Sequence, residues 1–148
     1  MATLKVKIQE DIILDNQDYG SKRIVEISSI NEIMKRVVTC AASQTTTIAV
    51  FNSNSYGAAG AIDIEDSRYV RVTNLDSSNA VELAVVGAAT LYQVKLAACQ
   101  SHVLGSADDL MLSEADTSPS FGTMADLGSI QVNPGGNAVN VELFIASA

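Results

Sequence analysis

The sequence contains no tryptophan, one histidine, two cysteines and two prolines. Only seven of its 148 residues are phenylalanine or tyrosine, so the core must be built from valine, isoleucine, leucine and alanine. A chain of this length matches one domain, 1–148, and buries about 70% of the surface that its unfolded form exposes. Hydrophobic residues make up 47% of the chain, which excludes intrinsic disorder. A core with so few large side chains is thin, and association with other protein surfaces would thicken it.

Basic residues are also scarce: nine stand against seventeen acidic residues, for a net charge of −8. This charge repels nucleic-acid phosphates and anionic lipid headgroups. The basic residues are scattered and form no stripe with interleaved aromatics. Residues 1–8 alternate charged and apolar side chains, unlike a signal peptide. We therefore expect no nucleic-acid or membrane partner, and synthesis in the cytoplasm.

Candidates for catalysis are few. Every Ser-His-Asp or Cys-His-Asn system would have to use His102, which lies in a short strand-like segment where a structural histidine is the simpler interpretation. Cys40 and Cys99 lie in apolar segments and are expected to be buried free thiols, although the sequence does not show whether they pair. The glycine-rich segments 57–60 and 135–136 match no phosphate-binding motif. We expect no enzymatic activity and no cofactor.

The sequence also provides few clustered ligands for a metal ion. One histidine and two distant cysteines do not supply the clustered ligands of a zinc site. Calcium needs six to eight converging oxygens, and the loop 15–20 lacks the required ligands at its third and fifth positions. Two acidic groups are better interpreted as solvated loops than as a cation site or an acid/base pair: Asp63, Glu65 and Asp66, and Asp108, Asp109, Glu114 and Asp116.

What the chain has in abundance is alternation of apolar and polar residues with a period of two. In the opening segment Leu4, Val6 and Ile8 share one face, and Lys5 and Lys7 share the other. Further strand-like segments follow, separated by turn residues; most alternate in the same way, and 43–51 is strand-like by its threonine-rich composition. These segments are 22–27, 36–40, 43–51, 61–65, 68–74, 80–86, 89–96, 127–132 and 138–145.

Two pairs of segments have the form of β-hairpins. Segments 68–74 and 80–86 flank the turn residues 75–79, and segments 127–132 and 138–145 flank the turn 133–137. Residues 31–36 are compatible with a helix, but their β-branched neighbours favour a strand. Core candidates are Tyr92, Val94 and Leu96, and in the closing segment Val139, Val141, Leu143 and Ile145.

The pattern predicts an all-β protein: an antiparallel β-sandwich, jelly-roll-like, of about eight to ten short strands. Its threonine- and serine-rich strand faces and small residues suit packing against identical neighbours, as at Ala58-Ala59 and Ala97-Ala98. The first and last strands are candidates for exchange between subunits, because terminal segments cross between copies at low cost.

Segments 27–33 and 36–39, the segment Tyr69–Asp76 and the closing Val139–Ser147 resemble small structural proteins in the virions of tailed bacteriophages. The resemblance implies an all-β homo-oligomer, with a trimer favoured, located in the virion and in contact with the major capsid protein or other virion proteins. Capsid decoration is preferred over a tail, neck or fibre position, and no active site carries over. The sequence names neither the position in the particle nor the host.

Two alternatives remain at this point. One is a carbohydrate- or receptor-binding module on the same sandwich, with Tyr56, Tyr69 or Tyr92 stacking on sugar rings. The other is a hydrolase that uses His102 or a carboxylate pair.

Overall fold

The structure is a computed structural model that describes residues 1–53, 61–113 and 121–148. Its regular elements are all strands, so the all-β prediction is confirmed, and residues 32–40 form a strand rather than a helix. None of the described residues forms a helix that could cross a membrane. The strands are β1 (Ala2–Glu10), β2 (Ile13–Leu14), β3 (Gln17–Asp18), β4 (Ser21–Ile30), β5 (Glu32–Cys40), β6 (Thr46–Asn52), β7 (Ile62–Asp63), β8 (Ser67–Asn74), β9 (Val81–Gly87), β10 (Leu91–Leu96), β11 (Ser101–Leu104), β12 (Met111–Leu112), β13 (Met124–Ala125), β14 (Leu127–Asn133) and β15 (Val139–Ser147).

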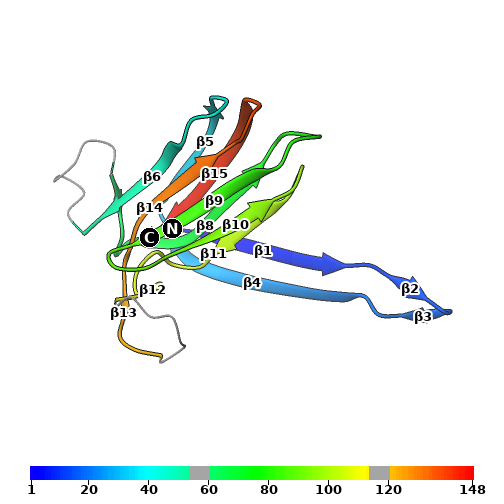
Figure 1. Cartoon of the computed structure of the whole chain (residues 1–148). Coiled ribbons are helices and arrows are strands. Elements are labelled where there is room, and N and C mark those ends of the chain that lie inside the picture. The colour runs from blue at the N-terminus through cyan, green and yellow to red at the C-terminus, as the bar shows by residue number, and fades with distance from the viewer. Residues whose placement is uncertain (54–60, 114–120) are drawn as a thin grey trace.

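Two sheets pack face to face and form a sandwich (Figure 1). One sheet has the order β10-β9-β14-β6-β7 and the other has the order β11-β8-β15-β5. Leaving out the short β7, the sandwich has eight strands, which in chain order are β5, β6, β8, β9, β10, β11, β14 and β15. If these are numbered 1 to 8, the two sheets have the strand orders 1-8-3-6 and 2-7-4-5. This arrangement is the jelly roll, which is built from two Greek keys; here successive strands lie in opposite sheets except β9 and β10, which pair within one sheet. The predicted jelly-roll-like sandwich is therefore confirmed.

The topology corrects both hairpins expected from the sequence. Strand β8 pairs with β11 and β15, whereas β9 pairs with β10 and β14, so the chain crosses between the sheets at residues 75–80. Strands β14 and β15 likewise lie in different sheets. Alternation shows which side chains of a strand point inward, but any antiparallel neighbour satisfies it equally well. The predicted strands are right and the predicted pairing is wrong.

The core lies between the two sheets and consists mainly of aliphatic side chains, as the composition predicted. The inward residues of β15 are almost completely buried, and Leu96 with the partly buried Tyr92 and Val94 fills the β10 side. Strand β15 pairs with β5 along one edge and with β8 along the other, so neither edge is open to a neighbouring subunit. The four inward residues of β15 are Val139, Val141, Leu143 and Ile145.

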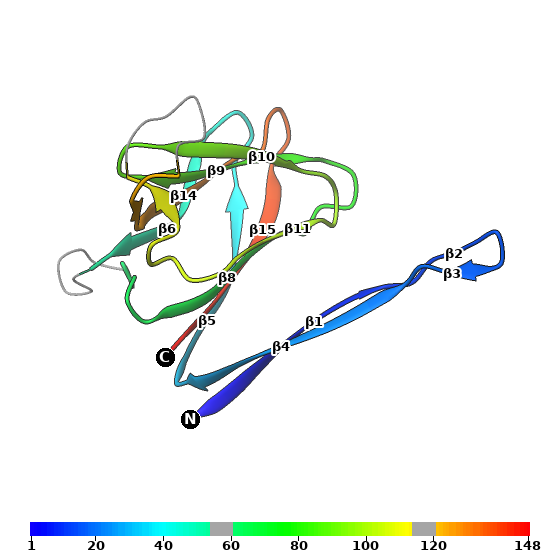
Figure 2. The ribbon, with the colours of Figure 1, turned by 90° about the horizontal axis from the view of Figure 1, so that it is seen from below.

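The first thirty residues lie outside the sandwich and form a long ribbon, which we call the arm (Figure 2). Strands β1 and β4 pair with each other and with no other strand, and the short strands β2 and β3 extend the ribbon. The chain reverses at Asp15 and Asn16, whose φ angles are 50° and 64°. Positive φ at both central residues of a two-residue loop is the signature of a type I′ turn, which Asp and Asn tolerate better than most residues. The turn expected at 15–20 is thus the end of a projecting hairpin.

One buried side chain ties the ends of the two sheets together. The Asn74 amide, fully buried at the end of β8, donates to the carbonyls of Asn79, Leu96 and Ala97 at 2.8, 3.3 and 3.1 Å. Its oxygen accepts the backbone N–H of Asp76 at 3.0 Å. Because these partners belong to the 75–80 crossover and to the end of β10, the amide fixes how the chain passes between the sheets.

We predict that Asn74→Leu lowers the free energy of unfolding by about 2–4 kcal/mol, because it leaves several buried polar groups without a partner. Chemical denaturation monitored by circular dichroism measures the loss. Ser77→Ala, in the exposed part of the same crossover, is the matched control and should leave stability nearly unchanged. Equal stabilities of the two variants would contradict the role given to Asn74.

Candidate interaction surface

The arm is an amphipathic ribbon. In its antiparallel register Leu4 lies opposite Ile27 and Val6 opposite Val25, so these side chains share one face with Ile8. The opposite face carries Lys5 and Glu26, whose ion pair measures 2.8 Å, together with Lys7, Ile24, Gln9 and Lys22. The predicted division of β1 into an apolar and a charged face is confirmed.

Only the base of the apolar face is covered. Ile30 is buried in a small cluster with Tyr69 and Ala146 on the outer side of the β11-β8-β15-β5 sheet. Leu4, Val6 and Ile27 pack against this cluster. Phe144 meets Tyr69 edge to face with 6.0 Å between ring centroids. This contact anchors the arm to the sandwich and leaves the rest of the ribbon projecting from it (Figure 2).

Beyond the base the arm exposes its apolar side chains to solvent. On the apolar face Ile8 and Val25 are 54% and 52% exposed, although the same face is covered a few residues nearer the sandwich. The segment 11–20, which we call the tip, is still more open and carries Asp11, Asp15 and Asp18 among its apolar residues. The exposed apolar side chains of the tip are Ile12, Ile13, Leu14 and Tyr19.

A groove of about 230 Å³ runs where the arm leaves the sandwich, and we call it the base groove. Four successive residues of β1 line it, and because successive side chains of a strand point to opposite faces, the groove borders the edge of β1. Among the described residues that edge pairs with no strand, since β1 pairs there with β4 alone. The lining residues are Leu4, Lys5, Val6, Lys7, Tyr69, Arg71 and Phe144.

The three cations of the base groove differ in whether their hydrogen-bonding and charged groups have partners. The Arg71 guanidinium lies 5.5 Å from the centre of the Phe144 ring and donates through Nη2 to Glu142, but its Nε–H has no acceptor among the described residues. Lys5 forms an ion pair with Glu26, whereas Lys7 has no ion-pair partner among the described residues. The groove therefore combines an apolar floor with positive charge.

His102 belongs to β11, the edge strand of one sheet, and faces Tyr92 on β10, the edge strand of the other sheet. Its Nε2 and the hydroxyl of Tyr92 are 3.0 Å apart, so these two side chains connect the two sheets. Burial lowers the pKa of His102 and raises that of Tyr92. No cysteine or carboxylate is hydrogen-bonded to His102 in the described residues, so its observed contact is structural.

The two cysteines differ in their surroundings. Cys40 is free and buried, as expected, and burial raises the pKa of its thiol. Cys99 is free but exposed, which corrects the expectation that it is buried. It lies in the turn after β10 with a φ of 62°, where the chain reverses between the sheets. Apolar neighbours such as Ala97 and Ala98 suggested a strand interior, but they belong to this turn.

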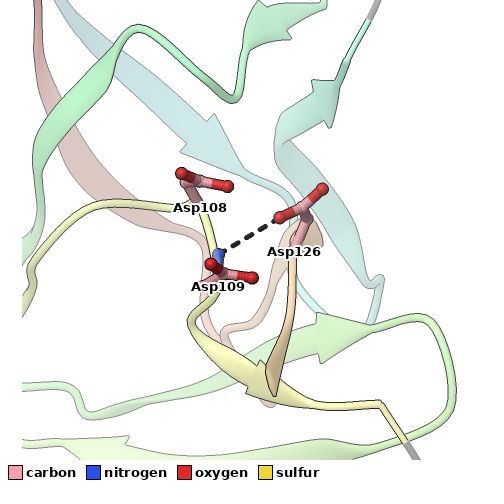
Figure 3. Close-up of side chains that lie close together, drawn as sticks. All are labelled: Asp108, Asp109 and Asp126. Carbon is pink, nitrogen blue, oxygen red and sulfur yellow. Dashed lines mark hydrogen bonds between the residues drawn. The ribbon is translucent and has the colours of Figure 1, made fainter. Parts of the chain in front are cut away.

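The acidic groups are only partly assembled by the fold. Carboxylate oxygens of Asp108, Asp109 and Asp126 lie within 4.8 Å of one another, and Asp126 accepts the backbone N–H of Asp109 at 3.1 Å (Figure 3). Asp126, which sequence reasoning missed, comes from the far side of the 113–123 connection. These are oxygen ligands of the kind that hold Ca²⁺, but three carboxylates fall short of the six to eight oxygens it takes. Loss of hydration, the hydrogen bond to Asp126 and the neighbouring charges raise the pKa of Asp108.

Other candidates are not brought together or lie outside the described residues. Asp63 and Asp66 line a hollow of about 240 Å³ beside Glu32, while Glu65 is exposed. Tyr69 is only 9% exposed under the arm, and the Tyr92 hydroxyl meets His102, so neither presents a ring for stacking on a sugar. Outside the described residues are Tyr56, Gly57–Gly60 with Ala58-Ala59, Glu114 and Asp116.

The sequence contains a signal for the arm that differs from simple alternation. The tip places Ile12, Ile13 and Leu14 in succession between acidic residues, without the alternation that a strand with one buried face requires. Such a run next to a two-residue Asp-Asn turn indicates a hairpin that no second layer covers.

We predict that His102 makes the fold acid-sensitive. Its pKa lies below the ordinary value of 6.5, so the unfolded chain takes up the proton first as the pH falls. The contribution to stability is complete above about pH 6.5 and is lost as the pH falls through the pKa of the folded state. In thermal melts between pH 7 and pH 4.5, His102→Gln should lose less stability on acidification than the unmodified chain. Parallel curves for the two proteins would contradict this assignment.

We predict that Asp108→Asn raises the melting temperature at pH 7, because it removes a carboxylate that loses hydration and is repelled by Asp109 and Asp126, which are among the causes of its raised pKa. The folded state takes up this proton before the unfolded state does, so the advantage of the variant shrinks as the pH falls. Glu65→Gln removes one exposed charge elsewhere and should show neither effect. A lower melting temperature for Asp108→Asn would contradict the repulsion.

Comparison with known proteins finds no matching family model and no matching curated protein. The chain is similar to a solved structure from Bacillus endospore appendages, described as a novel family of disulfide-linked pili. The match has 11% sequence identity and a TM-score of 0.43, and covers 81% of this chain and 88% of that chain. At these values the similarity supports no inference about function.

Proposed function

We propose that this protein is a structural subunit that assembles with copies of itself and that its arm is the connecting element. The observation that carries the proposal is the amphipathic ribbon whose apolar face and tip stay uncovered beyond the base. The inner faces of the sandwich are satisfied within one chain, whereas the arm is not. A second protein surface is the natural cover for it.

The energetics of a two-stranded ribbon support this proposal. An isolated hairpin is marginally stable in water, and free strand edges attract other strands. Full burial of one large aliphatic side chain contributes about 1.5–3 kcal/mol, so covering even the exposed halves of these side chains would be a substantial gain. Eight large apolar side chains of the arm are more than half exposed: Met1, Ile8, Ile12, Ile13, Leu14, Tyr19, Ile24 and Val25.

The charge distribution favours a second copy of the same chain. Four of the nine basic residues lie in the first thirty residues, whereas twelve of the seventeen acidic residues lie in the remainder. A basic stem beside a strongly acidic sandwich favours contact between an arm and the body of a neighbour. The acidic residues of the tip oppose insertion into an anionic membrane.

Within this role we place the subunit in the virion of a tailed phage, decorating the capsid as a homo-oligomer, with a trimer favoured and the major capsid protein or another virion protein as partner. The support is the resemblance of segments 27–33, 69–76 and 139–147 to phage structural proteins. The jelly roll adds an analogy of fold alone, because viral capsid domains are among the proteins that use it. A tail, neck or fibre position fits the same arm. The proposal assigns no enzymatic activity.

The decisive experiment is the mass of the purified full-length chain in solution. Multi-angle light scattering at micromolar concentration should give a multiple of 15.5 kDa. Val25→Asp puts a charge on the exposed part of the apolar face and should weaken assembly by about tenfold or more, since the buried charge would lack a partner. A monomeric unmodified chain at this concentration would remove the proposal.

Leu91→Asp is the matched control, since Leu91 is a strand residue of the sandwich with 55% exposure, close to that of Val25. It should leave the mass unchanged. Circular dichroism verifies that both variants are folded. If Leu91→Asp dissociates the assembly and Val25→Asp does not, the connecting surface is the sandwich and not the arm.

A further inference from the structure

We propose that the base groove of one copy receives the tip of the arm of a second copy, so that subunits join head to tail. This inference rests on the proposed function and adds to it the surface that accepts the arm. It follows from three properties of the groove and the tip that match one another.

The first property is an unpaired strand edge, which both the groove and the tip possess. The groove borders the unpaired edge of β1, and the hairpin β2–β3 at the tip pairs with no further strand. An extended segment can therefore add to β1 as a third strand, with main-chain hydrogen bonds supplying affinity. Widening a two-stranded ribbon to three or more strands is also what such a ribbon needs for stability.

The second property is apolar surface. The floor of the groove is built from Leu4, Val6, Tyr69 and Phe144, and this floor continues the cluster that anchors the arm. The tip presents Ile12, Ile13, Leu14 and Tyr19, all more than half exposed. Docking would remove apolar surface from water on both partners.

The third property is charge. The groove contains the cations Lys5, Lys7 and Arg71, and Lys7 has no ion-pair partner in the described residues. The tip carries three aspartates and no basic residue. Opposite charges on two otherwise apolar surfaces favour this pairing and disfavour groove against groove or tip against tip.

The groove cannot be filled by the tip of the same chain. The tip lies at the end of the ribbon that is farthest from the sandwich, whereas the groove lies at its base (Figure 2). A ribbon of paired strands is extended, with about 3.3 Å per residue, so its two ends stay apart. The donor must be a second copy. A head-to-tail contact closes into a ring when the rotation between copies permits it, and a ring of three agrees with the favoured trimer.

Two charge reversals test the pairing on the full-length chain. Lys7→Glu makes the groove acidic, and Asp11→Lys makes the tip basic; Asp11 is chosen because Asp15 holds the turn and Asp18 accepts the N–H of Gly20. Each variant alone should raise the concentration for half-assembly by about tenfold or more, because like charges meet in every contact.

Combining Lys7→Glu and Asp11→Lys in one chain should restore assembly. In this double variant every basic tip meets an acidic groove, whatever the number of subunits in the ring. Light scattering follows the mass. Lys95→Glu, a reversal on the sandwich outside the groove, should assemble normally and should not rescue Asp11→Lys.

Two results would overturn the inference. If either single variant assembles like the unmodified chain, the tip does not enter the groove. If both single variants dissociate and the double variant stays dissociated, the arms join in another way, such as arm to arm. In both cases Val25→Asp still reports on the proposed function, because that function fails only if this variant assembles normally or the unmodified chain is monomeric.

Discussion

The whole structure depends on one constraint: an apolar sheet face must be covered by a second layer. The sandwich meets it within the chain, because most successive strands cross to opposite sheets and each sheet covers the other. The aliphatic core is thin but complete, with the inward residues of β15 at its centre. Asn74 and the pair Tyr92–His102 satisfy the polar atoms where the chain passes from one sheet to the other.

The arm is where the same constraint stays unmet. Two strands make one layer, and the sandwich covers only the first few residues of it through Tyr69, Phe144 and Ala146. The remaining apolar face and the tip project away from the core (Figure 1). The self-assembly that we propose would supply the second layer from another copy. Stability of the sandwich and assembly through the arm are then separate properties, which point substitutions can change one at a time.

Burial of apolar surface does not select one partner surface over another, whereas charge complementarity does. Apolar surfaces attract any other apolar surface, but a basic groove and an acidic tip discriminate between partners. The charge of an acidic sandwich repels another sandwich over a distance set by the salt concentration, so the self-assembly that we propose has to be made through the arm. At Asp108, loss of hydration, the hydrogen bond with Asp126 and the neighbouring carboxylates raise the pKa of the carboxyl group.

The sequence by itself determined the strands, their inward faces and the all-β sandwich, because a period of two is a local property of each segment. It also determined the apolar and charged faces of β1. Only the tertiary structure decided that 68–74 and 80–86 lie in different sheets, that Asp126 joins Asp108 and Asp109, and that Cys99 is exposed. Pairing and exposure depend on which distant segments meet, and alternation is equally compatible with many partners. That Ile8 and Val25 are uncovered while Leu4 is not follows from where the sandwich ends, which no local pattern encodes.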